Sequence, residues 1–239
     1  MQDFVQLWVY LSTTPLFGLA ATLVCYLAAH ALYTRLDQAP WANPVLWTVV
    51  ALAGLLTVTG TPYPRYFSGA QFIHFLLGPA VVALAWPLWQ RRAQLRRQGL
   101  ALLLAGLAGG AAAAFSAVGL GWALGLPGDL LRSLAPKSVT APVAMGIAEQ
   151  LGGIPALAAV LAVLTGLVGA ISGKYLFKLL RVQRPEVRGF ALGTASHGIG
   201  AARAMQVHPD AGAYAGLALG LQVLLAALLM PLLASWLML

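Results

Sequence analysis

Long uncharged, apolar stretches alternate along the chain with short segments that hold the charged residues. Six of the stretches exceed the roughly 20 apolar residues with which an α-helix crosses the hydrocarbon core of a bilayer. They are residues 4–34, 38–64, 66–90, 98–128, 150–173 and 211–239. The pattern therefore predicts about six transmembrane helices.

Two further uncharged stretches are too short to cross a membrane. Residues 138–148 and 189–202 are 11 and 14 residues long, lengths that favour elements entering and leaving the bilayer on one side. We therefore expect an all-α polytopic membrane protein with re-entrant or discontinuous helical segments near residues 129–150 and 189–208.

Composition excludes a water-soluble protein. Of the 239 residues, 60% are hydrophobic and 8% are charged, whereas a soluble domain carries about 25% charged residues. Asp3 precedes a long apolar stretch without the basic start of a cleavable signal peptide, so we expect the first segment to be retained. The one cysteine, Cys25, lies within an apolar stretch and provides neither a disulfide framework nor a thiolate metal site.

The net charge of +8 sits in the short connecting segments rather than on an amphipathic face, which indicates membrane topology and no nucleic-acid partner. If both short stretches return to the side they came from, the main basic clusters and Arg35 all face the cytoplasm, and both termini lie outside. If the stretch 138–148 crossed the membrane completely, the two main basic clusters would lie on opposite sides of it. They are Arg91, Arg92, Arg96 and Arg97, and Lys174, Lys178, Arg181, Arg184 and Arg188.

An internal similarity supports this topology. A shift of 56 residues pairs Ser138 with Thr194 and Thr140 with Ser196. The two units, each a long span plus a short segment, then start on opposite sides of the membrane and form an inverted repeat, a common construction in transporters. We expect one membrane domain, with a three-span scaffold over residues 1–98 and a transport part over residues 99–239.

The first short stretch follows a proline-bounded sequence, Pro136-Lys-Ser-Val-Thr-Ala-Pro. Ser138 and Thr140 stand just ahead of Pro142, an arrangement typical of a capped helix start. At a hairpin tip, the N–H groups of this helix start would attract an anion, and Lys137 would add positive charge. The alternative is an extracellular loop that simply leads into a helix.

The second short stretch combines Thr194, Ser196 and His197, and Arg203 follows. An arginine in the apolar layer costs roughly 2.5–3.5 kcal/mol, which favours a partner for Arg203, either Glu149 or a bound carboxylate. Alternatively, Arg203 extends to the cytoplasmic surface. His197 either couples proton movement to transport or is a hydrogen-bonded packing residue.

No metal, cofactor or enzymatic activity is expected, because no Ser/Lys, paired Asp or metal-ligand spacing occurs. We expect Glu149 to serve as a gating residue or charge partner. The candidate substrate-binding residues are Lys137, Ser138, Thr140, Thr194, Ser196, His197 and Arg203.

These stretches resemble the LrgB/CidB family, which also includes the plastid glycolate/glycerate transporter. The similarity runs through nearly the whole chain. The matching phrases are Tyr66-Phe-Ser-Gly-Ala-Gln-Phe, Leu76-Leu-Gly-Pro-Ala, Pro136-Lys-Ser-Val-Thr-Ala-Pro, Gln150-Leu-Gly-Gly-Ile-Pro, Arg188-Gly-Phe-Ala-Leu-Gly-Thr-Ala-Ser-His and Gly200-Ala-Ala-Arg-Ala.

The resemblance implies a multi-pass protein of the bacterial inner (cytoplasmic) membrane with one of two functions. Some members look like transporters of pyruvate or related short hydroxy- and keto-acids. Bacterial members were named holin-like or antiholin-like modulators of murein hydrolase activity and cell lysis, usually beside a small LrgA/CidA-type membrane partner.

Two hypotheses follow from the residues and the resemblance together. The first is a transporter or exchanger of small monocarboxylates, such as pyruvate, glycolate or glycerate, which uses the two polar stretches. The second is a holin-like protein that oligomerises, which would explain small-residue helix faces such as residues 106–114. These faces also favour a homodimer.

Overall fold

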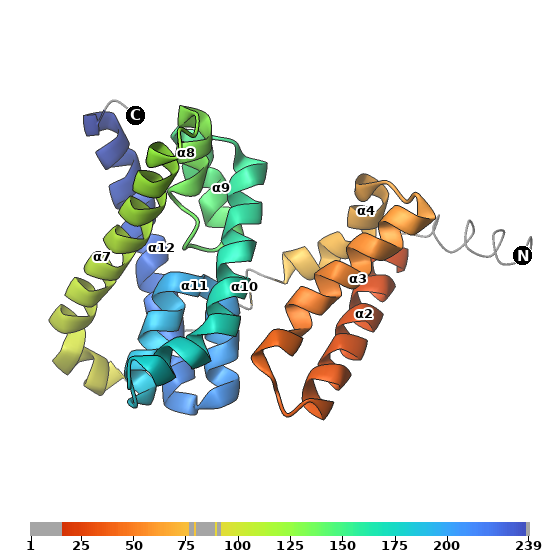
Figure 1. Cartoon of the computed structure of the whole chain (residues 1–239), viewed down its shortest axis with the longest axis horizontal. Coiled ribbons are helices and arrows are strands. Elements are labelled where there is room, and N and C mark those ends of the chain that lie inside the picture. Colours follow the sequence, from red (N-terminus) through yellow and green to blue (C-terminus); the bar gives the residue numbers. More distant parts are fainter. Residues whose placement is uncertain (1–15, 77–78, 80–88, 90–91, 238–239) are drawn as a thin grey trace, which may run out of the picture. The chain divides into compact units, whose positions relative to one another are not determined.

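The computed structural model describes residues 16–76, 79, 89 and 92–237. These residues form helices, turns and loops, and no strand occurs among them. The chain divides into two compact units, Met1–Ala83 and Leu84–Leu239 (Figure 1).

The first unit contains helices whose ends follow local sequence signals. Helix α3 begins at a proline, and the side chain of Asn43 accepts hydrogen bonds from the N–H groups of Val45 and Leu46 at 2.9 and 3.2 Å. It ends at Gly60, which has a φ of 62° and so the left-handed conformation that glycine favours. The elements are α2 (Leu16–Arg35), η1 (Pro40–Ala42), α3 (Pro44–Thr59) and α4 (Tyr63–Phe75).

The second unit holds the remaining described helices. They are α7 (Arg92–Ala123), α8 (Gly128–Leu134), α9 (Ala141–Gln150), α10 (Pro155–Leu179), α11 (Pro185–Val207) and α12 (Pro209–Leu237). Prolines stand in the first turn of α9, α10 and α11, where the missing N–H costs no helical hydrogen bond.

The described residues include four helices long and apolar enough to cross a membrane. These are α2, α10, residues Arg96–Ala123 of α7 and residues Pro209–Leu232 of α12. They confirm the predicted all-α membrane class. The predicted span 66–90 and the start of the span 4–34 fall partly outside the described residues, so the count of six stays a prediction.

Within the second unit, α7 and α12 run in one direction and α10 runs in the other (Figure 1). The Tyr214 hydroxyl donates to Gln98 Oε1 at 2.9 Å, which places the start of α12 beside the start of α7. Where α7 ends, Gly121 lies against Leu131 of α8. The Ile154 N–H at the start of α10 donates to Ser133 Oγ of α8 at 2.7 Å.

The segment from α8 to α9 enters the unit and returns to the same end. Its connecting residue Val139 packs in one buried cluster with Ala162 of α10 and Ala226 of α12. Helix α9 then leads back along α10, until Gly152 and Gly153 again lie beside α8.

Helix α11 also reverses direction. It is interrupted at Ser196 (φ −131°, ψ 16°) and His197 (φ 41°, ψ −134°). A Cβ atom added to Gly200 would lie 2.5 Å from the Leu192 carbonyl oxygen, so the two halves fold against each other.

Both halves of α11 pack on α12. In the first half, Gly189 and Gly193 lie against the backbone of Ala211 and Ala215, so this half runs parallel to α12. In the second half, Met205 lies against Gly212, so this half runs back toward the start of α12.

Candidate functional site

The tip of the first reversal presents a buried hydroxyl beside a lysine. Ser138 is buried, and Lys137 Nζ donates to its Oγ at 3.5 Å from a half-buried position. Helix α9 begins at Ala141, directly after Thr140, so a helix start lies where the sequence indicates one. The expected capping bond of Thr140 is wrong, because its side chain makes none.

The tip of the second reversal is buried more deeply. Thr194, Ser196 and His197 are 6%, 1% and 5% exposed. His197 Nε2 lies 2.7 Å from the carbonyl oxygen of Ala162 and donates to it. Among the residues that the structure describes, Thr194 Oγ1 and Ser196 Oγ find no hydrogen-bond partner. A buried hydroxyl without a partner costs roughly 1–3 kcal/mol, so two such hydroxyls only two residues apart need an explanation.

Glycines of the neighbouring helices make room for this tip. A Cβ atom at Gly166 or Gly169 of α10 would overlap the His197 ring or Ser196 Oγ. A Cβ atom at Gly109 of α7 would crowd the Thr194 methyl group. The tip therefore touches the central parts of both long helices.

Sequence reasoning missed a further polar residue, Gln222, near the middle of α12. It is 4% exposed, its Nε2 donates to the Gly106 carbonyl oxygen at 2.6 Å, and its Oε1 faces Gly110. The available signal was an isolated amide in the uncharged stretch 211–239. Polar residues inside spanning helices commonly face the protein interior.

The two tips approach the same level of α7. Ser138 lines a cavity together with Gly110 and Gln222, and Thr194 contacts the adjacent Gly109. Gly109 and Gly110 lie near the centre of α7. Two segments that are some 56 residues apart in sequence thus both lie beside the middle of α7.

Arg203 and Glu149 lie elsewhere and are not brought together. Arg203 is half-buried on the second half of α11, next to Ala204, which packs with Ala211 near the start of α12. Glu149 is exposed at the end of α9, beside the start of α10. Because α10 and α12 begin at opposite ends of the unit, the structure does not support the expected pair.

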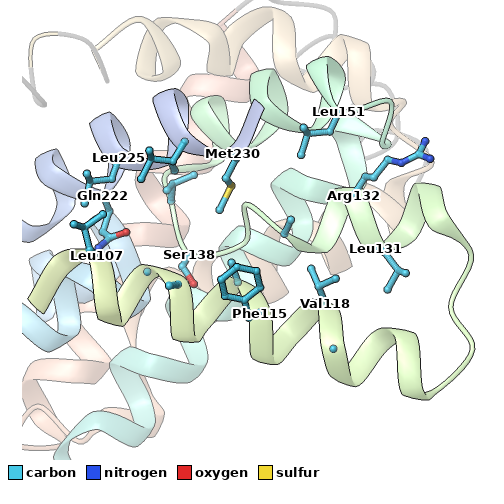
Figure 2. Close-up of a pocket in the computed structure, with 18 of the residues that line it drawn as sticks. Leu107, Phe115, Val118, Leu131, Arg132, Ser138, Leu151, Gln222, Leu225 and Met230 are labelled. Atoms are coloured by element: carbon cyan, nitrogen blue, oxygen red, sulfur yellow. The ribbon is translucent and has the colours of Figure 1, made fainter. Parts of the chain in front are cut away.

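A cavity of about 490 Å³ extends from the first tip between α7, α8 and α12 (Figure 2). Gln222 lies toward one end, Arg132 toward the other, and Ser138 between them. Most of its remaining wall is apolar, including Leu107 and Phe115.

Comparison with known proteins matches this chain to one protein family. A model of the LrgB-like family matches residues 22–236, which include both tips. The uncharacterized protein YwbG of Bacillus subtilis (strain 168) is 32% identical over 219 residues, 92% of this chain and 97% of that protein. An uncharacterized protein of Haemophilus influenzae is 36% identical over 189 residues, 79% of this chain and 82% of that protein.

A relative with a functional name covers almost the whole chain. The holin-like protein CidB of Staphylococcus aureus is 29% identical over 234 residues, 98% of each chain. No solved structure matches the chain.

Proposed function

Because the chain belongs to the LrgB-like family and is a multi-pass helical membrane protein, we propose that it transports or exchanges small monocarboxylates of the pyruvate, glycolate or glycerate type. It acts without enzymatic chemistry or a cofactor. The observation that carries the proposal is that both hairpin tips lie beside the middle of α7, and that Thr194 and Ser196 of the second tip hold buried hydroxyls with no partner among the described residues.

The tips offer the groups that recognise a carboxylate. The start of α9 directs N–H groups and the positive end of its dipole toward the substrate. Lys137 and Ser138 supply a charge and a hydroxyl beside this helix start. Thr194 and Ser196 donate from the second tip, so a bound substrate gives both hydroxyls the partner that they lack within the described part of the chain.

The arrangement also supports alternating access. We propose six spans and two re-entrant hairpins that enter from opposite sides as an inverted repeat, with residues 1–98 as scaffold and 99–239 as transport part. The ends with Arg96 and Lys174 face the cytoplasm of a bacterial inner membrane. His197 fixes the second tip through its hydrogen bond to Ala162.

The second candidate is a holin-like modulator of murein hydrolase activity and cell lysis, and the name of the Staphylococcus aureus relative favours it. In this function the protein would oligomerise, as a homodimer or with a small LrgA/CidA-type membrane protein. One observation favours transport over this alternative. Part of the small-residue face of α7, at Gly106, Gly109 and Gly110, is occupied within the chain by Leu221, Gln222 and Thr194.

Flux measurements with purified protein in liposomes distinguish the two functions. A transporter gives saturable uptake of labelled pyruvate, which is accelerated when unlabelled pyruvate is trapped inside. A holin-like pore gives a leak that is limited by solute size and does not saturate, and that result would overturn the transport proposal.

A pair of serine variants tests whether pyruvate transport depends on the second tip. Ser196→Ala removes a buried hydroxyl, and we expect KM for pyruvate to rise roughly three- to tenfold, the effect of one lost hydrogen bond. Ser172→Ala is the matched control, because the exposed Ser172 hydroxyl only donates to the Val168 carbonyl oxygen within α10. Equal KM values for the two variants would contradict a binding role of Ser196.

A further inference from the structure

The cavity between α7, α8 and α12 is larger than a pyruvate-sized substrate requires. Its volume of about 490 Å³ falls in the range of about 300–1,000 Å³ that is typical of pockets for drug-sized molecules. Side chains of Leu107, Phe115, Val118, Leu131 and Met230 line it (Figure 2).

The polar groups of the cavity are few and none is acidic. Among the described residues, the polar side chains of its lining are Ser138, Gln222 and Arg132, together with the indole of Trp122. The Gln222 amide already donates to Gly106, and Arg132 Nη1 donates to the Gly152 carbonyl oxygen at 3.5 Å. Lys137 lies next to Ser138, so an anion is favoured at the first tip, from which an apolar wall extends.

We propose that this cavity receives the hydrocarbon side chain of the substrate, and that the protein therefore prefers branched or extended monocarboxylates of about four to six carbons over pyruvate. This inference rests on the proposed function for the carboxylate end, at Lys137 and Ser138. The side chain would lie along Phe115 and Val118 of α7 (Figure 2).

The preference for longer substrates is expected because hydrocarbon occupies an apolar cavity more favourably than water does. Water in an apolar cavity lacks the two to four polar partners that hold a buried water molecule. A methylene group that leaves water for such a wall contributes about 0.8 kcal/mol, which corresponds to roughly fourfold in affinity. Affinity should rise by roughly this factor for each added methylene until the cavity is full.

Binding can be measured separately from transport. The full-length protein in lipid nanodiscs is titrated with pyruvate, 2-oxobutyrate, 3-methyl-2-oxobutyrate and 4-methyl-2-oxopentanoate, and Kd is taken from the rise in Tm, since a ligand that binds the folded state stabilises it. We expect Kd to fall roughly two- to fourfold per carbon along the series. The same acids should inhibit labelled pyruvate uptake into liposomes in the same order.

Two variants of α7 test whether the substrate side chain binds in this cavity. A Cβ atom at Gly119, which lines the cavity, meets nothing within 4 Å, so Gly119→Leu starts from open space and reduces the volume available to a substrate. Gly99→Leu is the control, because Gly99 is equally open but does not line the cavity. Gly119→Leu should weaken binding of 4-methyl-2-oxopentanoate at least tenfold and leave that of pyruvate unchanged, whereas Gly99→Leu should alter neither.

The outcomes separate this inference from the proposed function. Graded binding without saturable flux supports the inference and contradicts transport. Saturable pyruvate flux with equal Kd values along the series overturns the inference and leaves transport standing. The inference is also overturned if a phospholipid copurifies and Gly119→Leu releases it without changing the acid series, because the cavity then holds a lipid chain.

Discussion

At the scale of residues, glycines decide how closely the helices of the second unit approach one another. Gly189 and Gly193 stand one turn apart on α11 and contact the carbonyl groups of Ala211 and Ala215. Small residues at this spacing let two helical backbones meet, as they commonly do in membranes. Any larger side chain at these positions must push α11 away from α12.

The variant Gly193→Ala tests this close approach. The added methyl group would overlap the Ala215 carbonyl oxygen, and we expect the free energy of unfolding to fall by about 1–3 kcal/mol, a typical effect of overpacking. Gly220→Ala on α12 is the control, because its Cβ meets nothing within 4 Å. Thermal unfolding in detergent measures both, and an unchanged Tm for Gly193→Ala would contradict the packing.

His197 has a backbone conformation that glycine adopts more readily. Its φ of 41° lies in the region that favours residues without a Cβ. Replacing His197 by Ala or Gly removes the same hydrogen bond to Ala162. The difference in stability between the two variants therefore measures the backbone strain at this position. We expect His197→Gly to be more stable than His197→Ala by about 1 kcal/mol. Comparison of their Tm values checks this, and a more stable Ala variant would show that the position is not strained.

Several residues of the candidate site were predictable from local sequence. Ser138 was singled out as a hydroxyl just ahead of a proline-marked helix start, and Thr194, Ser196 and His197 as a polar cluster in a stretch too short to cross the membrane. All four are buried at the tips. Gln222 escaped notice because one amide in α12 belongs to no motif and its partner, Gly106, lies more than 100 residues away. Contacts of this kind depend on tertiary packing.

At the scale of elements, the lengths of the apolar stretches indicated which segments turn back, but not the residue at which α11 reverses. Both short stretches lie in segments that turn back, α8–α9 and α11. The interruption of α11 falls at Ser196 and His197, where no proline marks a break. Packing against Gly166 and Gly169 fixes that site, and such packing cannot be read locally.

Cysteine labelling tests whether each segment returns to the side it came from. In a Cys25→Ser background, Leu126→Cys and Ile154→Cys flank α8–α9, and Val187→Cys and Val207→Cys lie near the ends of α11; all four positions are exposed. We expect a membrane-impermeant maleimide to label the first pair only from outside and the second pair only from inside. Labelling of one pair from opposite sides would mean that its segment crosses the membrane.

At the scale of the whole molecule, the exposed cations of the second unit gather at one end. The start of α7 carries Arg92, Arg96 and Arg97, and the last part of α10 carries Lys174 and Lys178. Both ends adjoin the first half of α11, where Leu102 packs against Phe190 and Gly173 lies against Leu192. The charge asymmetry inferred from the sequence thus corresponds to one end of the helical bundle.

Removing these charges should disturb the orientation of the protein. In the quadruple variant Arg96→Gln, Arg97→Gln, Lys174→Gln, Lys178→Gln, we expect a fraction of the molecules to insert inverted, because Lys and Arg near the ends of spans set topology. A Val207→Cys substitution added to this variant detects the inverted fraction, because inverted molecules are labelled from outside and the others from inside. The control Arg65→Gln with Arg132→Gln should leave orientation unchanged, and an unaffected quadruple variant would argue against the assigned sidedness.

The close packing of the α11 and α12 backbones has a consequence for the proposed transport cycle. Since Gly189 and Gly193 leave no gap between these helices, a movement of α11 that exposes Ser196 in the proposed transport cycle would carry α12 along. Met230 on α12 also borders the cavity beside α7. Exposure of Ser196 and reshaping of that cavity would then be one movement, and a substrate whose side chain fits poorly would be transported more slowly even if its carboxylate were bound well.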